Sequence, residues 1–231
     1  MEDAKEITKI IIKGSSGYCA YSEAYKDRLT IEKGKTLGIV GESGCGKSTT
    51  GRAILRLLEP TDGQVIFNGQ DITALSGSRM RQMRRDMQII FQDPFSSLDP
   101  KKTVSQTIAE PIIENKILKD KKAIDARVRE LMATVGLAER LVNAYPHELD
   151  GGRRQRIGIA RALAMEPKFI VCDEPVSALD VSIQAQILNL LKALQRKHQL
   201  AYIFISHDLG VVRALCHQVM VLRQGEVVEQ G

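Results

Sequence analysis

The sequence predicts an α/β fold with a mostly parallel sheet, and three observations indicate it. First, "KTLGIVGESGCGKSTTGRAILRLL" predicts a buried strand at Thr36–Val40, a glycine-rich turn, and a helix from about Lys47. Second, three further apolar runs, each short and ending in polar residues, predict strands at 87–93, 169–175 and 200–208. Third, the stretch from Pro94 to Met165 is helical in period, which predicts a helical insert between the strands.

Two hairpins are predicted from local turn signals. "GQVIFNGQDI" alternates apolar and polar residues and contains Asn68-Gly69, a dipeptide typical of tight hairpin turns. "QVMVLRQGEVVEQG" predicts a second hairpin around Gln224-Gly225. Neither stretch has the period of a helix, so both are expected to form antiparallel strands.

The domain organisation follows from the position of the helical insert. Its helical periods cover 103–117, 121–137 and 152–165. We find no internal repeat or low-complexity linker. We therefore expect a single domain over 1–231, with a core at 1–92 and 165–231 and a helical subdomain at 93–164.

Composition narrows the classes of partner and compartment. The 231 residues carry a net charge of +5 with a pI near 9.0, which suggests an anionic partner. The basic cluster from Arg79 to Arg85 is expected to be a solvated helix face. The four cysteines form no CxxC pair, which favours a reducing compartment and argues against a metal or disulfide framework. No apolar run reaches the roughly 18 residues that a membrane span needs.

The glycine-rich turn carries the strongest chemical signal. "GESGCGKST" fits the pattern G-x-x-x-x-G-K-[ST] between a strand and a helix, which is the context that this phosphate-binding motif requires. Its glycines let backbone N–H groups cradle phosphates, and the helix dipole adds partial positive charge. Lys47 is placed to reach the β- and γ-phosphates, and the Ser48 hydroxyl is placed to bind Mg²⁺. The candidate ATP-binding residues here are Gly41, Ser43, Gly44, Cys45, Gly46, Lys47, Ser48 and Thr49.

A second motif, which is acidic, completes a candidate site for Mg-ATP. "FIVCDEP" predicts a buried strand that ends in Asp173 and Glu174. We expect Asp173 to hold the metal through its water shell and Glu174 to polarise the attacking water. Two acids that merely end a strand would be the simpler interpretation if they stood alone, but they lie downstream of the phosphate-binding motif.

Three weaker signals follow a consistent order along the chain. Gln92 ends the 87–93 strand, where its amide could contact Mg²⁺ or water. His207 ends the 200–208 strand, from which an imidazole could reach a γ-phosphate. A short loop follows the acidic motif directly and consists of Ser177, Ala178, Leu179 and Asp180.

Taken in order, these motifs and "GGRRQR" resemble an ATP-binding-cassette (ABC) ATPase over essentially the whole chain. "GESGCGKST", "IIFQDPFSSLDP", "YPHEL" and "CDEPVSALDVSIQAQILNLL" are similar to the ATPase subunits of oligopeptide and dipeptide importers, with nickel importers close by. The resemblance implies a P-loop NTPase fold with a RecA-like core, an antiparallel β subdomain and a helical subdomain. It also implies a peripheral subunit on the cytoplasmic face of the membrane.

The resemblance further implies a set of partners and cofactors. Such cassettes use ATP and Mg²⁺ and work as a head-to-tail dimer beneath two transmembrane permease subunits. A solute-binding protein takes part indirectly, and no nucleic acid is involved. ATP lies between the P-loop of one chain and the signature loop of the other, usually Leu-Ser-Gly-Gly-Gln. The family also stacks adenine on an upstream aromatic residue, for which Tyr18 is the first candidate and Tyr21 and Tyr25 compete.

The signature loop departs from the family pattern. In this chain it consists of Leu149, Asp150, Gly151, Gly152 and Arg153. Asp150 is as good a helix cap as serine, but an ionised aspartate cannot donate a hydrogen bond to a γ-phosphate. Like unit charges 4 Å apart cost about 4 kcal/mol at an effective dielectric near 20, although Arg153 or Arg154 could offset part of this. The loop is therefore either re-tuned and working or weakened.

The expected function is hydrolysis of ATP to drive an importer of oligopeptides, dipeptides or a similar solute. Alternatives are a nickel importer ATPase, and a degenerate regulatory cassette that hydrolyses ATP poorly in one site of a heterodimer. A cassette that powers export and a soluble cassette of translation or DNA repair are further alternatives. Because a heterodimer would confine the aspartate signature to one site, a distinct second ATPase subunit is the expected partner.

Overall fold

The computed structural model describes residues 11–13, 30–60 and 63–231, which group into two compact units. The first unit combines 1–88, 168–174 and 192–231, and the second combines 89–167 and 175–191. The second unit therefore holds the predicted helical insert together with the segment that follows the acidic motif. The predicted boundary of the subdomain at 93–164 remains a prediction.

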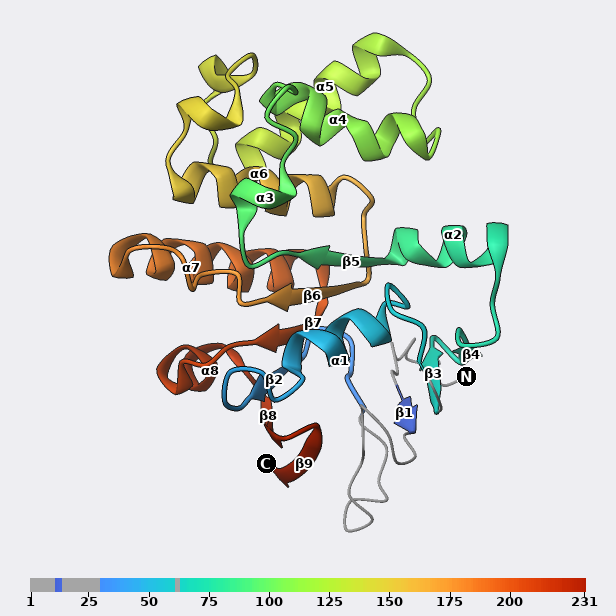
Figure 1. Ribbon diagram of the computed structural model, residues 1–231. Helices are drawn as coiled ribbons and strands as arrows, with labels where there is room; N and C mark the ends of the chain where they lie inside the picture. The colour runs from blue at the N-terminus through green and yellow to red at the C-terminus, as the bar shows by residue number, and fades with distance from the viewer. Residues whose placement is uncertain (1–10, 14–29, 61–62) are drawn as a thin grey trace, which may run out of the picture. The chain divides into compact units, whose positions relative to one another are not determined.

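A six-stranded sheet has the strand order β5-β6-β7-β2-β8-β9 (Figure 1). Strands β6, β7, β2 and β8 are parallel neighbours, and β9 runs antiparallel to β8. Every residue of β2, β6 and β7 is buried, as expected for parallel strands covered on both faces. In sheet order the bounds are Met87–Ile90, Phe169–Asp173, Ala201–Ile205, Thr36–Val40, Gln218–Arg223 and Glu226–Gln230.

Two helices of the first unit are held close to this sheet. Helix α1, Lys47–Ile54, contacts β6 and β7, and helix α8, Leu209–Leu215, contacts β2. A Cβ added at Gly51 would lie 2.9 Å from Cγ1 of Val171 and 3.0 Å from Cδ1 of Ile205. Glycine at this position therefore lets α1 approach the sheet more closely than any larger residue would allow.

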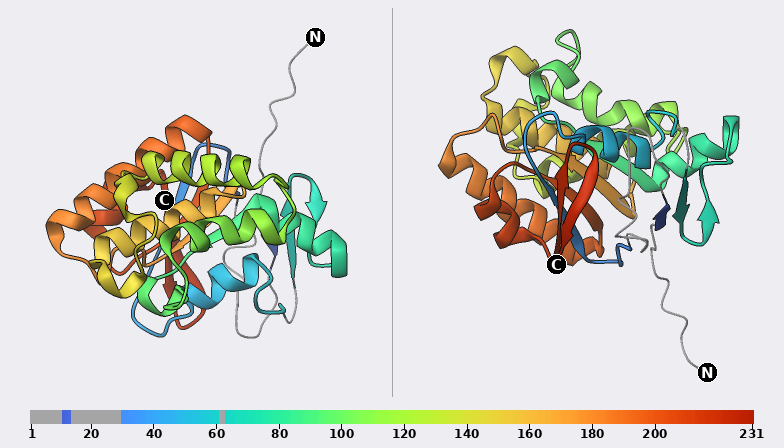
Figure 2. Two further views of the ribbon diagram at one scale, coloured as in Figure 1. Left: turned by 90° about the horizontal axis from the view of Figure 1, so that it is seen from above. Right: turned by 60° about the horizontal axis from the view of Figure 1, so that its bottom comes forward.

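Both predicted hairpins are confirmed. A three-stranded antiparallel sheet has the order β1-β3-β4, from Ile11–Lys13, Gln64–Phe67 and Gln70–Asp71. Its turn places Asn68 at φ 49° and Gly69 at φ 78°, and the β8–β9 turn places Gln224 at φ 50° and Gly225 at φ 85°. Two successive positive φ angles are the mark of the turn that matches the twist of paired strands. Figure 2 shows β8 and β9 running side by side to the C-terminus.

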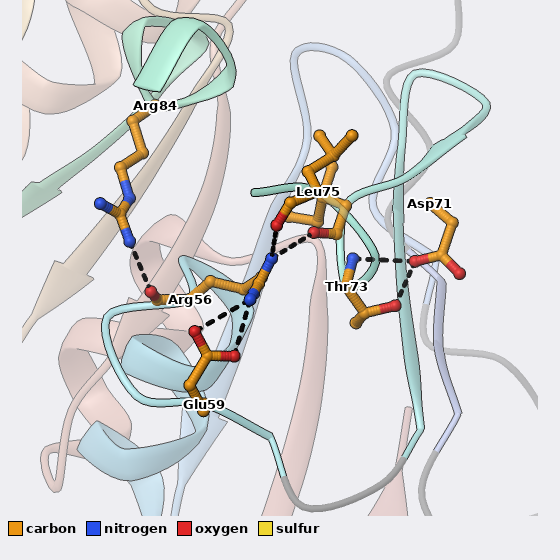
Figure 3. A network of polar contacts seen from close by, with 7 residues as sticks. Arg56, Glu59, Asp71, Thr73, Leu75 and Arg84 are labelled. Carbon is orange, nitrogen blue, oxygen red and sulfur yellow. Dashed lines mark hydrogen bonds and ion pairs between the residues drawn. The ribbon is translucent and has the colours of Figure 1, made fainter. Parts of the chain in front are cut away.

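The predicted arginine cluster lies on helix α2, Gly77–Asp86, where Arg79, Arg81 and Arg84 are exposed. Arg84 donates a hydrogen bond of 2.7 Å to the carbonyl oxygen of Arg56, which follows α1. The Arg56 guanidinium in turn donates to the carbonyl oxygens of Ile72 and Leu75 and pairs with Glu59 (Figure 3). This network ties the end of α1 to the segment between β4 and α2.

The second unit is mainly helical. Its helices α3 to α6 span Pro94–Ser97, Val104–Glu114, Lys121–Thr134 and Gly151–Leu163. Helix α6 contacts α3, α4 and α5, and two short 3-10 turns, Glu139–Leu141 and Pro146–Glu148, lie between α5 and α6. Helix α7, Val181–His198, begins in the second unit and ends in the first.

Each helix from α3 to α6 is preceded by a capping residue whose side-chain oxygen accepts a hydrogen bond from a backbone N–H of the first turn. Such an N–H has no partner within the helix, so the cap supplies one. These capping residues are Asp93, Thr103, Asp120 and Asp150. Across the part of the chain that is described, no helix has the length and apolar character needed to cross a membrane. The predicted α/β class is thus confirmed, with a largely parallel sheet, an antiparallel sheet and a helical part.

Candidate functional site

The glycine-rich loop joins the carboxyl end of β2 to α1. Gly41, Gly44 and Gly46 have φ angles of 153°, 79° and 102°, a region that other residues rarely adopt. A Cβ at Gly41 would lie 2.2 Å from the carbonyl oxygen of Leu222 and 2.7 Å from Sγ of Cys45. Both the backbone angles and the close contacts therefore require glycine here.

Lys47, the first residue of α1, bends back over this loop. Its side chain is 5% exposed, and its Nζ donates to the carbonyl oxygens of Gly41 at 2.9 Å and of Glu42 at 2.8 Å. The two bonds hold the ammonium group beside the N-terminus of α1, where the helix dipole adds further positive charge. A cation beside a helix N-terminus that follows a glycine-rich loop is an arrangement suited to phosphate.

Ser48 and Asp173 are 125 residues apart in sequence but in direct contact. Ser48 Oγ donates a hydrogen bond of 2.6 Å to Asp173 Oδ1, and Asp173 is buried at the end of β6. The other carboxylate oxygen lies 3.7 Å from the guanidinium of Arg52. Arg52 was not among the predicted site residues, although its position four residues after Ser48 places both on one face of α1.

These oxygens fit the metal that the family resemblance implies. Mg²⁺ is bound through one or two carboxylates, several waters and the phosphates of its substrate rather than through a protein cage. Within the described residues, no group of three or more His, Cys, Asp or Glu side chains could hold a metal ion. A hydroxyl beside a single buried carboxylate, next to a phosphate-binding loop, matches the small donor set that Mg²⁺ takes.

Glu174 and His207 form a pair beside Asp173. The carboxylate oxygen Oε2 of Glu174 lies 3.1 Å from Nδ1 of His207, and the Glu174 side chain is 14% exposed. The backbone of Glu174 has φ 45°, and its N–H donates to the carbonyl oxygen of Ile205 at 3.1 Å. A left-handed glutamate costs conformational energy, and such strain clusters at functional sites. Glu174 follows β6 and His207 follows β7, so both lie at the carboxyl edge of the parallel strands.

The signature loop and the 177–180 loop lie together in the second unit. A Cβ at Gly151 would lie 3.0 Å from Cδ2 of Leu179, and one at Gly152 would lie 2.7 Å from Cγ2 of Ile183. The two glycines thus allow the start of α6 to approach the start of α7. Residues that are about 28 positions apart in sequence, from Gly151 to Leu179, are brought into one surface.

Asp150 contacts Arg153 through both of its carboxylate oxygens. Its Oδ1 accepts from the backbone N–H of Arg153 at 2.7 Å, and its Oδ2 lies 3.3 Å from Nη1 of the same residue. Asp150 therefore caps α6, as its position predicted, and it is also ion-paired. Arg154, the other candidate partner, instead places its guanidinium 5.1 Å from the ring centre of Phe95.

Gln92 and Tyr18 are the two remaining candidates. Gln92 is exposed and belongs to the second unit. Its predicted contact with Mg²⁺ remains a prediction. Tyr18, with its competitors Tyr21 and Tyr25, falls outside the described residues.

The cysteines of the described regions are free thiols, namely Cys45, Cys172 and Cys216. Burial raises the pKa of Cys216 to about 12, and burial raises the pKa of Cys172 further.

Because the thiolate is the reactive species, we expect Cys216 to react with iodoacetamide at pH 8 about 10³-fold more slowly in the folded chain than in denaturant, where an ordinary thiol pKa near 8.5 applies. Mass spectrometry of digested, alkylated protein measures both rates, and equal rates would contradict the burial.

Comparison of the sequence with known proteins identifies a family and relatives. A family model described as ABC transporter matches residues 26–177. The chain is 55% identical over 200 residues to the oligopeptide transport ATP-binding protein OppF of Bacillus subtilis, which covers 86% of this chain and 66% of that protein. It is also 55% identical over 198 residues to the glutathione import ATP-binding protein GsiA of Escherichia coli. This match covers 86% of this chain and 32% of that protein. The chain therefore spans less than two thirds of the length of these relatives.

Solved structures show the same fold. The ATP-binding cassette MJ0796, in a dimeric post-hydrolysis state bound to ADP and Pi, matches with a TM-score of 0.81 and 30% identity over 98% of this chain and 96% of that one. The cbiO1 protein of Clostridium perfringens matches with a TM-score of 0.82 and 28% identity over 100% of this chain and 89% of that one. From the matched family model and these relatives, the chain belongs to the ABC transporter family.

Proposed function

We propose that this chain is the ATP-hydrolysing subunit of an ABC importer that couples ATP binding and hydrolysis to uptake of oligopeptides, dipeptides or a similar solute. The observation that carries the proposal is the cluster of Lys47, Ser48, Asp173, Glu174 and His207 at one edge of the parallel sheet. The names of the relatives, oligopeptide transport and glutathione import proteins, support peptides over nickel as the solute.

In the proposed mechanism the first unit binds the nucleotide. Backbone N–H groups of the Gly41–Thr49 loop surround the phosphates, and Lys47 exchanges its loop carbonyl partners for phosphate oxygens. Ser48 and Asp173 would hold Mg²⁺, which supplies neutralisation of the charge that develops on the phosphates. The contact of 2.6 Å between these two side chains already places their oxygens together.

Glu174 is the proposed general base. A carboxylate that is 14% exposed and placed beside the phosphate-binding loop can accept a proton from the attacking water. His207 bonds to Glu174 through Nδ1 and so restricts the orientation of the carboxylate. The second ring nitrogen of His207 then remains to contact the γ-phosphate, the role that the sequence predicted.

The proposed partners are a second ATPase subunit, two transmembrane permease subunits and, indirectly, a solute-binding protein. We infer that the second cassette is a related but distinct chain, which makes the two ATP sites chemically different. The assembly would hold this chain at the cytoplasmic face of the membrane. The net charge of +5 is compatible with such a surface.

The second unit offers a docking surface for a permease subunit. Phe95 lies on α3, three residues after Gln92, is 57% exposed and is stacked by Arg154. We expect Phe95→Asp to reduce co-purification of the permease subunits with a tagged chain, because a charge replaces an exposed ring that a partner would bury. The exposed position predicts a change in the free energy of unfolding within about 0.5 kcal/mol.

Leu57→Asp in the first unit is the matched control, since Leu57 is 47% exposed. Leu57→Asp should retain the permease subunits. Equal recovery of permease subunits with Phe95→Asp and wild type would remove Phe95 from the docking surface.

The transport assay tests the proposed function as a whole. Vesicles that contain the transporter purified through this chain should accumulate a labelled oligopeptide in the presence of its solute-binding protein only when Mg-ATP is on the side of this chain. Lys47→Ala should abolish the accumulation. Accumulation that is independent of ATP, or unaffected by Lys47→Ala, would refute the proposal.

A further inference from the structure

In the signature loop, Asp150 stands where the family has a serine, so the loop lacks that hydroxyl as a hydrogen-bond donor. The loop nevertheless has other hydrogen-bond donors. We propose that Arg153 replaces that serine as the donor to the γ-phosphate of a nucleotide bound by the partner cassette, and that Asp150 positions Arg153. The inference rests on the proposed function, because it needs the ATP site that two cassettes share. Asp150 is in this view a positioning residue, and Arg153 contacts the substrate.

The geometry of the pair leaves donors available. Asp150 accepts the Arg153 backbone N–H at 2.7 Å and lies 3.3 Å from one guanidinium nitrogen of the same residue. A guanidinium has five N–H donors in a planar fork, so one contact with a carboxylate leaves others for a phosphate. The pair also neutralises the Asp150 charge that would otherwise repel the phosphate.

The surroundings of the pair are positively charged. A cavity of about 290 Å³ lies beside the start of α6. Its charged lining residues are three arginines and one aspartate, namely Arg140, Arg153, Arg156 and Asp150. The first-turn N–H groups of Gly151 and Gly152 have no partner inside the helix. An anionic group that approaches the loop therefore meets cations and backbone donors as well as Asp150.

Arg153 and Arg156, two arginines of this cavity, differ in how firmly their side chains are held. Arg156 donates to the carbonyl oxygen of Val135 at 2.6 Å and to Oε1 of Gln186 at 3.2 Å, and these contacts fix its position. Arg153 is 47% exposed and its carboxylate partner is 58% exposed. Exposed ion pairs contribute little to stability, so the guanidinium can turn toward a phosphate without loss of the fold.

The two departures from the family pattern thus compensate each other. Aspartate in the serine position is tolerated because arginine stands in the glutamine position. This predicts that the substitutions Asp150→Ser and Arg153→Gln are strongly coupled. Arg153→Gln alone leaves an unpaired carboxylate facing the phosphate, whereas the double variant restores the usual family loop.

The test measures kcat and KM for ATP in the transporter purified from its host membranes through a tag on this chain. We expect Arg153→Gln to lower kcat about 10- to 100-fold, the effect of removing a hydrogen bond to a charged group. Arg153→Gln should lower kcat much less in an Asp150→Ser background than in the wild-type background, because serine supplies a donor and the unpaired carboxylate is gone, which is the coupling expected of residues in contact. Arg153→Lys, which keeps the charge, should retain more activity than Arg153→Gln.

Arg129→Gln is the matched control, because Arg129 is an ion-paired guanidinium of similar exposure in the same unit that does not line this cavity, and its replacement leaves the Asp150–Arg153 pair intact. Wild-type activity in Arg153→Gln, or a double variant that is no more active than Arg153→Gln, would overturn the inference. A loss in Arg129→Gln as large as that in Arg153→Gln would also overturn it. Failure of the proposed function shows separately, as ATP hydrolysis that Lys47→Ala does not reduce.

Discussion

The Glu174→Gln variant is expected to bind Mg-ATP as wild type does and to hydrolyse it about 10²- to 10⁴-fold more slowly, the range for loss of a general base. The amide has nearly the same shape as the carboxylate but does not accept a proton from water. It can still contact His207, which lies 3.1 Å from Glu174, so the local fold should persist. The measurements are phosphate release by the assembled transporter and ATP affinity by calorimetry.

Glu229→Gln on β9 serves as the control for Glu174→Gln, because it removes an exposed carboxylate in the same unit. It should hydrolyse ATP at the wild-type rate. If Glu174→Gln also releases phosphate at the wild-type rate, Glu174 is not the base. If it loses ATP binding instead, the residue acts in binding rather than in the chemical step.

Lys47→Ala is expected to weaken ATP binding by about 10²-fold, because each hydrogen bond between a charged group and phosphate contributes roughly 1.5–3 kcal/mol. The ammonium also donates to the carbonyl oxygens of Gly41 and Glu42, and its side chain is buried. A small loss in the free energy of unfolding, about 1–3 kcal/mol, should therefore accompany the loss of affinity.

Lys197→Ala, at the exposed end of α7, is the control for this change. Calorimetric titration with Mg-ATP, and thermal melting of both variants without nucleotide, separate binding from stability. Equal affinity in wild type and Lys47→Ala would remove the lysine from the phosphate site.

The strands and turns were predictable because their signals are local. Buried parallel strands appear as continuous apolar runs, and this holds for β2, β6 and β7. The turn at Asn68-Gly69 needs two positive φ angles, which few dipeptides adopt readily. Strand β1 was not predicted, because three residues carry too little periodicity to distinguish a strand from a loop.

The candidate site was predictable as a set of residue types but not as a set of contacts. The motifs placed Ser48 and Asp173 in one site, but their contact depends on the order of strands in the sheet. The left-handed backbone of Glu174 has no local signal, since tertiary contacts impose it. The pairing of Asp150 with Arg153 over Arg154 was left open by the sequence, because the stacking of Arg154 on Phe95 depends on the packing of α3 against α6.

A crystal structure of the Glu174→Gln chain with Mg-ATP tests the account most directly, since it shows where the nucleotide binds. The phosphates should lie inside the 41–49 loop, with Lys47 Nζ in contact with the β- and γ-phosphates and Mg²⁺ beside Ser48 Oγ and Asp173. Nucleotide bound elsewhere, or phosphates that make no contact with this loop and Lys47, would contradict it.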